Sequence, residues 1–321
     1  MNRYCAAPWS EQLRRVLAWR DRFEAGPEGI RIDERLVPVR GDVLRFRQDD
    51  GYNDTFALQW KKYRQTQLDQ MGKAALTRER FLRETGWRLD ELAGQLVLEA
   101  GSGAGRFTAL MAEAGAVLVT FDYSSAVEAN VLNNGRHPNV AFMQIDIFEM
   151  PFREGAFDRV FCHGVLQHTP DPGAAFARLA RMVKPGGRIS IDVYHRDGRI
   201  RPWKSKYLWR PLTTRMEPGK LLAFLEWFIP KWLPFDTLIK RIPVLRNYLG
   251  AIVPCWNYWY TNLSPEQKVQ WAVLDTFDAL APAYDLPATL DEVRAWFRDG
   301  GFTQVEVREG GNGIVGNGVK T

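Results

Sequence analysis

Short apolar runs alternate with amphipathic segments through the middle of the chain. Short apolar runs of this kind are typical of buried parallel strands, and the first three end beside Gly or Asp. The segments between them place apolar residues at helical spacing, and the segment 174–182 is stopped by Lys184-Pro185-Gly186-Gly187. The pattern predicts strands at 96–100, 117–121, 140–145, 159–162 and 188–193, and helices at 107–113, 127–132, 174–182 and 290–297.

This alternation predicts an α/β fold, with a parallel sheet covered by helices on both faces and joined by right-handed crossovers. The pattern breaks after Tyr194 and resumes near residue 286. We therefore divide the 321 residues into four parts. They are an N-terminal helical extension (1–88, with helices around 12–23 and 56–71), a Rossmann-like core (89–195), a helical insertion after the fifth strand (196–285), and a C-terminal helix with the last strands (286–321).

The composition is that of a globular protein, with 45% hydrophobic and 25% charged residues. Cys5, Cys162 and Cys255 form no CxxC pair, so we expect no disulfide framework and no metal site. The chain has no signal-like N-terminus and no run of 18 apolar residues. A cytoplasmic protein is therefore expected.

A glycine loop, Glu99-Ala100-Gly101-Ser102-Gly103-Ala104-Gly105-Arg106, directly follows the first core strand. Glycine is needed where the backbone turns tightly or approaches a ligand closely, and amides at a helix start favour an anionic group. The dinucleotide fingerprint GxGxxG would require glycine at position 106, where Arg106 stands. The spacing GxGxG instead favours a ligand without a pyrophosphate.

Two acidic residues follow the next two strands. Asp122 ends the second strand, 17 residues after Gly105, where a carboxylate can accept hydrogen bonds from both hydroxyls of a ribose. Asp146, followed by Ile147, could accept from the amino group of an adenine. Aspartate also favours turns, so both positions have a purely structural alternative.

Five blocks of the sequence together resemble the class I S-adenosylmethionine (SAM)-dependent methyltransferases, most closely the group that contains quinone-biosynthesis and many secondary-metabolism enzymes. The blocks are VLEAGSGAGRF (97–107), TFDYS (120–124), DIFEMPF (146–152), FDRVFCHGVLQHTPDP (157–172) and VKPGGRISI (183–191). The resemblance covers 96–194 closely and 286–321 loosely. It implies a Rossmann-like, seven-stranded, mostly parallel sheet, with SAM as cofactor and S-adenosyl-L-homocysteine as product.

The resemblance also assigns the residues that contact the cofactor. The glycine loop (Gly101, Ser102, Gly103 and Gly105) would hold the methionine part, Asp122 with Tyr123 the ribose, and Asp146 with Ile147 the adenine. Glu99 would order the loop or reach the methionine amino group, and 162–165, which include His163, would line the sulfonium side. Gln59 and Trp60 of the extension are expected to contact or enclose the cofactor, although Trp60 could simply pack on the sheet.

Three of the four histidines, namely His163, His168 and His195, follow the fourth and fifth strands, where ligands of open α/β sheets bind. His168 is the first candidate for a general base, with His163 and His195 behind it, because histidine accepts protons near neutral pH. His168 could also merely close a turn. A hydroxyl acceptor benefits from a base, whereas a carboxylate or neutral amine does not. We predict a small-molecule, lipid-linked or sugar-linked acceptor, with oxygen ahead of nitrogen and carbon.

The insertion is basic and aromatic. Between Arg196 and Arg246 there are twelve Lys or Arg and four Asp or Glu. Pro230, Pro234, Pro243 and Pro254 are expected to break it into short pieces. These pieces could form a lid over the acceptor, which we prefer, or contact a membrane peripherally through 196–260, or form a dimer interface.

Three other functions remain open. The basic excess would suit an RNA methyltransferase, but no Asn-Pro-Pro-Tyr-like motif follows the fourth strand, where His163-Gly164-Val165-Leu166 stands, and no RNA-binding module is visible. Nucleic acid is therefore disfavoured. A non-catalytic SAM-binding regulator would keep the same binding residues, and an NAD-dependent oxidoreductase is the most distant alternative.

Overall fold

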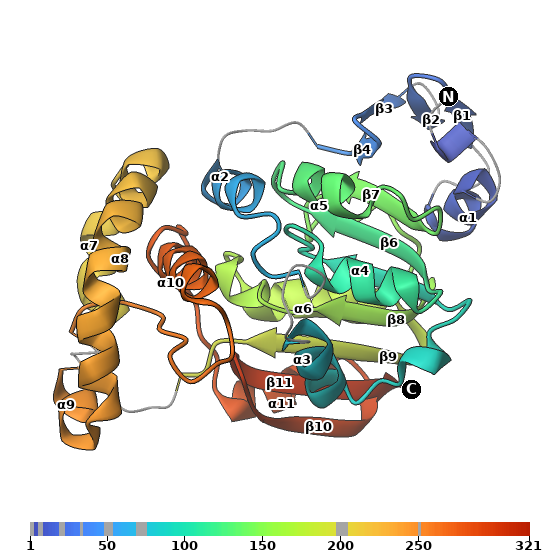
Figure 1. The fold of residues 1–321 in the computed structure, drawn as a ribbon. Helices are drawn as coiled ribbons and strands as arrows, with labels where there is room; N and C mark the ends of the chain where they lie inside the picture. The colour runs from blue at the N-terminus through green and yellow to red at the C-terminus, as the bar shows by residue number, and fades with distance from the viewer. Residues whose placement is uncertain are drawn as a thin grey trace.

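A computed structural model describes residues 3–5, 9–18, 23–32, 35–47, 54–68, 76–196, 205–249 and 252–321. Its centre is one sheet with the strand order β1-β2-β3-β4-β7-β6-β5-β8-β9-β11-β10 (Figure 1). The strands predicted in the core are present as β5 (Leu96–Ala100), β6 (Val117–Asp122), β7 (Val140–Gln144), β8 (Phe157–Cys162) and β9 (Val183–Val193). The sheet closes with the hairpin β10 (Phe302–Gly310) and β11 (Gly313–Lys320), in which β11 runs antiparallel to β9.

Helices cover both faces of this sheet, because its central strands are apolar on both sides. One face carries α3 (Leu76–Thr85), α4 (Arg106–Glu113) and α5 (Val127–Asn134), and its core includes Phe81, Phe107 and Val127. The other carries α6 (Pro172–Met182) and α11 (Leu290–Asp299), with Phe176 and Phe297 at its centre. The predicted α/β fold is confirmed. The chain order reverses between β5 and β8, which is where open sheets bind ligands.

The predicted helical extension is wrong in its first half. Helix α1 (Trp9–Val16) is followed by four strands, β1 (Phe23–Gly26), β2 (Gly29–Ile32), β3 (Arg35–Arg40) and β4 (Val43–Arg45), which enlarge the expected seven-stranded sheet to eleven. Gly41 and Asp42 both have positive φ, as a two-residue hairpin turn requires, and this turn directs β4 alongside β7. The helix expected at 12–23 corresponds to α1, which ends earlier, at Val16.

The helix expected at 56–71 is α2 (Asp54–Lys62), and residues 69–71 lie outside the described part of the chain. The insertion is helical, as predicted, and contains α7 (Ser205–Thr213), α8 (Pro218–Arg241), α9 (Pro243–Tyr248) and α10 (Pro265–Leu280). Figure 1 shows α7, α8 and α9 as an outer layer beyond α10, away from the sheet.

Pro230 and Pro234 do not break the insertion as predicted, because α8 continues through both. An interior proline costs a helix about 3 kcal/mol. Burial of an apolar side of α8 against α10 compensates for this loss, with Leu225, Ile229 and Phe277 in one cluster. Within the described residues, no helix is long and apolar enough to cross a bilayer.

Candidate active site

A cavity of about 770 Å³ lies at the carboxyl ends of the parallel strands, between the glycine loop and helices α2, α3 and α10. It gathers most of the predicted site residues. Those that line it are Gln59, Trp60, Gly101, Ser102, Gly103, Asp122, Tyr123, Asp146, Ile147, His163 and His168. Glu99, Gly105 and His195 lie outside the lining.

The glycine loop needs bare backbone at three positions. Gly101, Gly103 and Gly105 have φ values of 71°, 52° and 82°, in the left-handed region that favours glycine. A Cβ on Gly101 would lie 2.1 Å from Val165 Cγ2, and one on Gly103 would lie 3.0 Å from the Trp60 ring. The loop is therefore pressed between the end of β8 and α2.

Glu99 lies behind the loop and is buried. Its Oε2 atom accepts hydrogen bonds from Thr108 Oγ1 at 2.5 Å and Thr120 Oγ1 at 2.8 Å. Burial raises the pKa of Glu99 to about 7, although the two hydroxyl donors oppose this. This placement favours the loop-ordering role over direct contact with a ligand.

Asp122 also holds the loop. Its Oδ2 accepts from Gly103 N at 2.9 Å, and its Oδ1 accepts from the backbone N and the Oγ of Ser124 at 2.9 and 2.8 Å. A carboxylate has about four acceptor positions, so about one remains, on Oδ2. Burial raises the pKa of Asp122. A ligand hydroxyl would thus find a carboxylate that is already oriented.

The far end of the cavity is formed by Tyr123 and Asp146. The guanidinium of Arg47 lies 3.7 Å from the centroid of the Tyr123 ring and fixes it at the edge of β4. Asp146 Oδ1 accepts from Phe148 N at 2.8 Å, which leaves Oδ2 available to a ligand. Ile147 is buried beside it.

His168 is held at one ring nitrogen and free at the other. Its Nδ1 lies 3.0 Å from the carbonyl oxygen of Tyr284, and its ring contacts Phe56 and Tyr194 edge to face. Its Nε2 is buried, has no hydrogen-bond partner among the described residues and lies 3.8 Å from Asp278 Oδ2. Because a carbonyl can only accept, Nδ1 must carry a proton, and a neutral His168 then has its lone pair on Nε2.

His163 differs from His168 because both of its ring nitrogens have neighbours. Nε2 lies 2.9 Å from Ser190 Oγ, and Nδ1 lies 3.5 Å from Glu84 Oε2 and 3.6 Å from Asp192 Oδ2. Its ring stacks on Phe161 with the centroids 4.3 Å apart. His163 therefore lines the cavity with both ring nitrogens engaged by neighbouring side chains.

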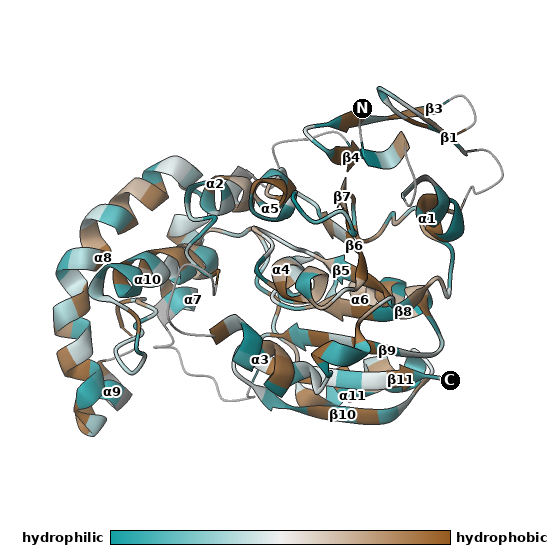
Figure 2. Ribbon diagram, turned by 45° about the vertical axis from the view of Figure 1, so that its right-hand side comes forward, coloured by the Kyte–Doolittle hydropathy of each residue, from teal (hydrophilic) through white to brown (hydrophobic). Residues whose placement is uncertain are grey.

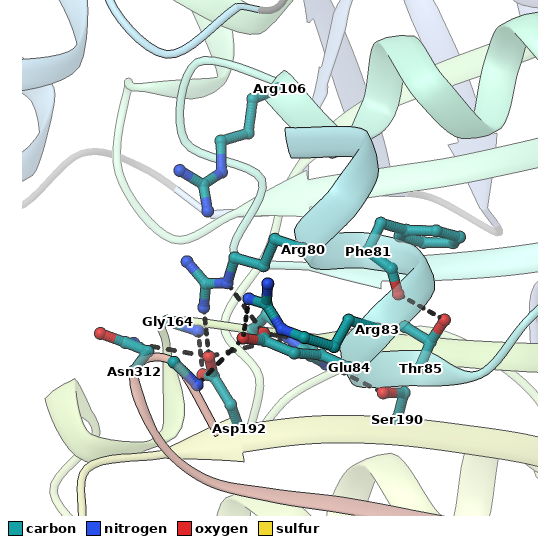
Figure 3. Close-up of polar contacts among 12 residues, drawn as sticks. Arg80, Phe81, Arg83, Glu84, Thr85, Arg106, Gly164, Ser190, Asp192 and Asn312 are labelled. Carbon is teal, nitrogen blue, oxygen red and sulfur yellow. Dashed lines mark hydrogen bonds and ion pairs between the residues drawn. The ribbon is translucent and has the colours of Figure 1, made fainter. Parts of the chain in front are cut away.

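Arg80 neutralises the two carboxylates beside His163 (Figure 3). Its Nε lies 2.8 Å from Glu84 Oε2 and its Nη2 2.5 Å from Asp192 Oδ2. Burial opposes ionisation of Glu84, but hydrogen bonds and charge from His163 and Arg80 hold its pKa well below the usual range. Glu84, His163 and Asp192 have a spacing that could suit a metal ion, but the guanidinium already supplies the positive charge.

His195 lies at the end of β9 with its Nδ1 3.4 Å from Glu309 Oε1. Its backbone pairs with that of Ala288. It therefore contacts the last hairpin and, unlike His163 and His168, does not line the cavity.

Sequence reasoning missed the wall contributed by α10. Asp278 accepts from Gln59 Nε2 at 3.2 Å and from Tyr194 Oη at 3.3 Å. One turn earlier, Asp275 accepts from Gln67 Nε2 at 3.2 Å, and burial raises its pKa to about 6. Two acids spaced i, i+3 in the mostly apolar second half of α10 (271–280) were the signal for this wall.

A half-buried arginine completes the same wall. Arg106 donates from Nη1 to Gln67 Oε1 at 2.6 Å. Burial, and then repulsion by Arg80, lower its pKa to about 10. Arg106 stands where the dinucleotide fingerprint would require glycine. Its side chain anchors the loop after α2.

Comparison with known proteins fixes the family. A family model described as a methyltransferase domain matches residues 98–191. A demethylmenaquinone methyltransferase of Corynebacterium urealyticum is 34% identical over 185 residues, which cover 58% of this chain and 69% of that protein. The chain belongs to the class I SAM-dependent methyltransferases. A ubiquinone biosynthesis O-methyltransferase of Alkalilimnicola ehrlichii is 35% identical over 112 residues, covering 34% of this methyltransferase and 45% of the relative.

Among solved structures, the magnesium protoporphyrin IX methyltransferase of Synechocystis PCC 6803 with bound S-adenosylhomocysteine matches with a TM-score of 0.43. It is 15% identical, over 84% of this chain and 98% of that one. The methyltransferase spans about half the length of most curated relatives that it matches.

Unpaired polar atoms in the cavity fit SAM, the cofactor of this family. Buried polar atoms in proteins are normally hydrogen-bonded. In the part of this methyltransferase that the structure describes, four residues line the cavity and have buried side-chain atoms without a partner, namely Gln59, Ser102, Gln167 and His168. Together with the free positions on Asp122 and Asp146, they offer donors and acceptors to a polar ligand along the whole cavity.

Proposed function

We propose that this methyltransferase transfers the methyl group of SAM to a hydroxyl oxygen of a largely apolar small molecule, and that His168 accepts the hydroxyl proton. The observation that carries the proposal is the unpaired Nε2 of His168, which lies on the cavity while Nδ1 is committed to Tyr284. A neutral imidazole with this tautomer is a ready base for a hydroxyl.

Asp278 supports the proton transfer electrostatically. Its Oδ2, 3.8 Å from Nε2, is near enough to stabilise the imidazolium that forms when His168 takes the proton. The hydrogen bonds from Gln59 and Tyr194 orient this carboxylate. Asp278 therefore acts through His168 and is a positioning residue.

The cavity wall favours an apolar or aromatic acceptor. Aromatic side chains contribute much of the lining near His168 and α10, and they are Phe56, Tyr194, Trp256, Tyr258, Tyr260, Trp271 and Tyr284. Binding sites of this composition take apolar ligands and use a few polar groups to orient them. The names of two matched relatives, a ubiquinone biosynthesis O-methyltransferase and an O-methyltransferase of Aspergillus nomiae, support oxygen as the acceptor atom.

Different residues would bind SAM and accept the proton of the acceptor. SAM supplies a methyl group bound to a positively charged sulfur. The glycine loop with Ser102, then Asp122, then Asp146 with Ile147 would hold its methionine, ribose and adenine parts. His168 takes the acceptor proton while the oxygen lone pair forms the bond to the methyl carbon, and the carbon–sulfur pair returns to sulfur. Alignment of the two reactants in the cavity would supply much of the remaining rate.

The test combines titration and an acceptor panel. Calorimetry with SAM and S-adenosylhomocysteine should give binding of both, and NAD should not bind. Hydroxylated aromatic compounds are then offered with SAM, and their methyl ethers serve as controls in which the hydroxyl is absent. Production of S-adenosylhomocysteine with the hydroxyl compounds alone, and its loss in His168→Gln but not in His195→Gln, is the expected result. SAM binding without turnover on any acceptor would favour a regulatory protein instead.

A further inference from the structure

Helix α8 is apolar on two opposite sides. Its inner side packs on α10 through buried residues such as Leu222, Leu225 and Ile229. Its outer side exposes Phe224, Trp227, Phe235 and Leu238, which are 46%, 60%, 62% and 61% exposed. The hydrophobic segments recur along the whole α8 ribbon in Figure 2. An apolar side of a helix is normally buried, so the outer side of α8 lacks a partner among the described residues of the monomer.

Two lysines belong to this outer side. Lys220, Phe224, Trp227, Lys231, Phe235 and Leu238 follow one another at intervals of three or four residues, which places them on one stripe. We call these six residues the outer stripe. The ammonium of Lys231 lies 3.8 Å from the centroid of the Trp227 ring. In the described part of the chain, neither Lys220 nor Lys231 forms an ion pair.

The acids of α8 are turned away from the outer stripe. Glu226 pairs with Lys62 of α2 at 2.6 Å, and Asp236 is buried and pairs with Lys240 at 2.8 Å. The outer stripe is therefore aromatic and positively charged, with no negative charge of its own. This combination matches the boundary of an anionic bilayer, where Trp and Phe enter between headgroups and lysines reach the phosphates.

We infer that the outer stripe of α8 binds the surface of a membrane that contains anionic lipids. Pairing with a second copy fits less well, because a two-fold interface would place Lys220 and Lys231 of both copies in an apolar contact with no acid to compensate them. The lipid surface, in contrast, solvates the lysines while it buries the rings. The helix lies along the membrane and does not cross it, in agreement with its length and polarity.

The inner side of α8 links this surface to the cavity. Asn257 Nδ2 donates to Asp236 Oδ2 at 2.8 Å and to Thr237 Oγ1 at 2.9 Å, and Lys240 Nζ donates to the carbonyl of Cys255 at 2.6 Å. Between these two anchored residues, Cys255 and Asn257, lies Trp256, which lines the cavity. A membrane-bound α8 would thus keep one wall of the cavity next to the lipid phase, from which an apolar acceptor could enter.

The experiment is flotation of the full chain with phosphatidylcholine vesicles and with vesicles that also contain phosphatidylglycerol. The wild type should float with the anionic vesicles and less with the neutral ones, and added salt should weaken binding. Trp227→Glu/Phe235→Glu should lower partitioning by about tenfold or more, and Lys220→Glu/Lys231→Glu should abolish the preference for anionic lipid. Leu132→Glu is the matched control, because Leu132 is an exposed apolar residue on α5, outside the stripe.

Circular dichroism and SAM titration of each variant establish that the fold and the cofactor site are intact. Equal flotation of the wild type and of Trp227→Glu/Phe235→Glu would overturn the inference. So would a wild type that ignores vesicles but is a dimer by light scattering and becomes monomeric in this variant, because the stripe would then bind a second copy. Neither readout involves the acceptor, so the outcome is independent of the proposed reaction.

Discussion

The Nδ1 atom of His168 lies 3.0 Å from the carbonyl oxygen of Tyr284, a residue 116 positions later in the chain. This contact joins the turn after β8 to the exit of the insertion. It fixes the imidazole so that its other nitrogen faces Asp278. The insertion therefore supplies both the group that sets the tautomer of His168 and the carboxylate beside its free nitrogen.

Asp278→Asn is expected to lower turnover by about tenfold to a hundredfold, because the charge that stabilises the protonated His168 is lost. SAM affinity should stay unchanged. The tautomer can be measured without an acceptor, by nitrogen NMR of the four histidines with His168→Gln for assignment. Protonated Nδ1 and bare Nε2 are expected in the neutral ring, and the opposite tautomer would remove the basis for the proposed base.

Asp122→Ala is expected to weaken SAM binding by about 1–3 kcal/mol, because the ribose loses its acceptor and Gly103 N loses its partner. Ser124→Ala provides the comparison. It removes one donor to Oδ1 and leaves the free position on Oδ2 untouched, so its effect on SAM affinity should be small. Calorimetric titration measures both, and equal losses would mean that Asp122 acts only by ordering the loop.

Gly101→Ala and Gly86→Ala separate steric overlap from backbone strain. Both glycines have positive φ, 71° and 63°, but a Cβ on Gly86 meets no described residue within 4 Å, whereas one on Gly101 meets Val165 at 2.1 Å. Strain alone should cost about 1–2 kcal/mol of unfolding free energy in each. Overpacking should add about 1–3 kcal/mol in Gly101→Ala, together with weaker SAM binding. Urea unfolding and calorimetry test this, and indistinguishable variants would contradict it.

Glu99 should make the fold less stable as pH rises. Its pKa is about 7 in the folded state against an ordinary value of 4.5, so the folded state binds the proton more tightly. Its contribution is therefore complete below about pH 4.5 and is lost as pH rises through 7, by about 3 kcal/mol at most. Glu99→Gln removes the titration and should be more stable than the wild type at pH 8, and close to it at pH 5.

Urea unfolding at both pH values measures this difference. The pKa values of Asp122 and Asp275 are raised as well, but both residues are present in both proteins, so the comparison isolates the contribution of Glu99. Glu154→Gln is a surface control, because the Glu154 side chain is 69% exposed. Parallel pH profiles for the wild type and Glu99→Gln would refute the assignment.

The sequence by itself determined the core. The spacing of apolar residues predicted β5 to β9 and the helices between them. A strand or helix can bury one or both of its faces only if its apolar residues recur with the period of that element. The spacing of the glycine loop, Asp122 and Asp146 indicated a nucleoside ligand without a pyrophosphate, since these residues follow consecutive strands whose carboxyl ends meet at one edge. The resemblance of the surrounding sequence to methyltransferases then implied SAM. Local pattern was weaker in the extension, where β1 to β4 are short and mostly pair with one another.

Only the tertiary structure decided how the distant parts meet. Pro230 and Pro234 predicted a break, yet contacts with α10 keep α8 continuous. Helix propensity describes only the local sequence, whereas the packing energy comes from residues that are distant in the chain. The same holds for the histidines. The sequence could rank His168 first by its place after β8. The hydrogen bond at its Nδ1 and the carboxylate near its Nε2 come from Tyr284 and Asp278, which lie more than 100 positions away and are brought to His168 only by folding.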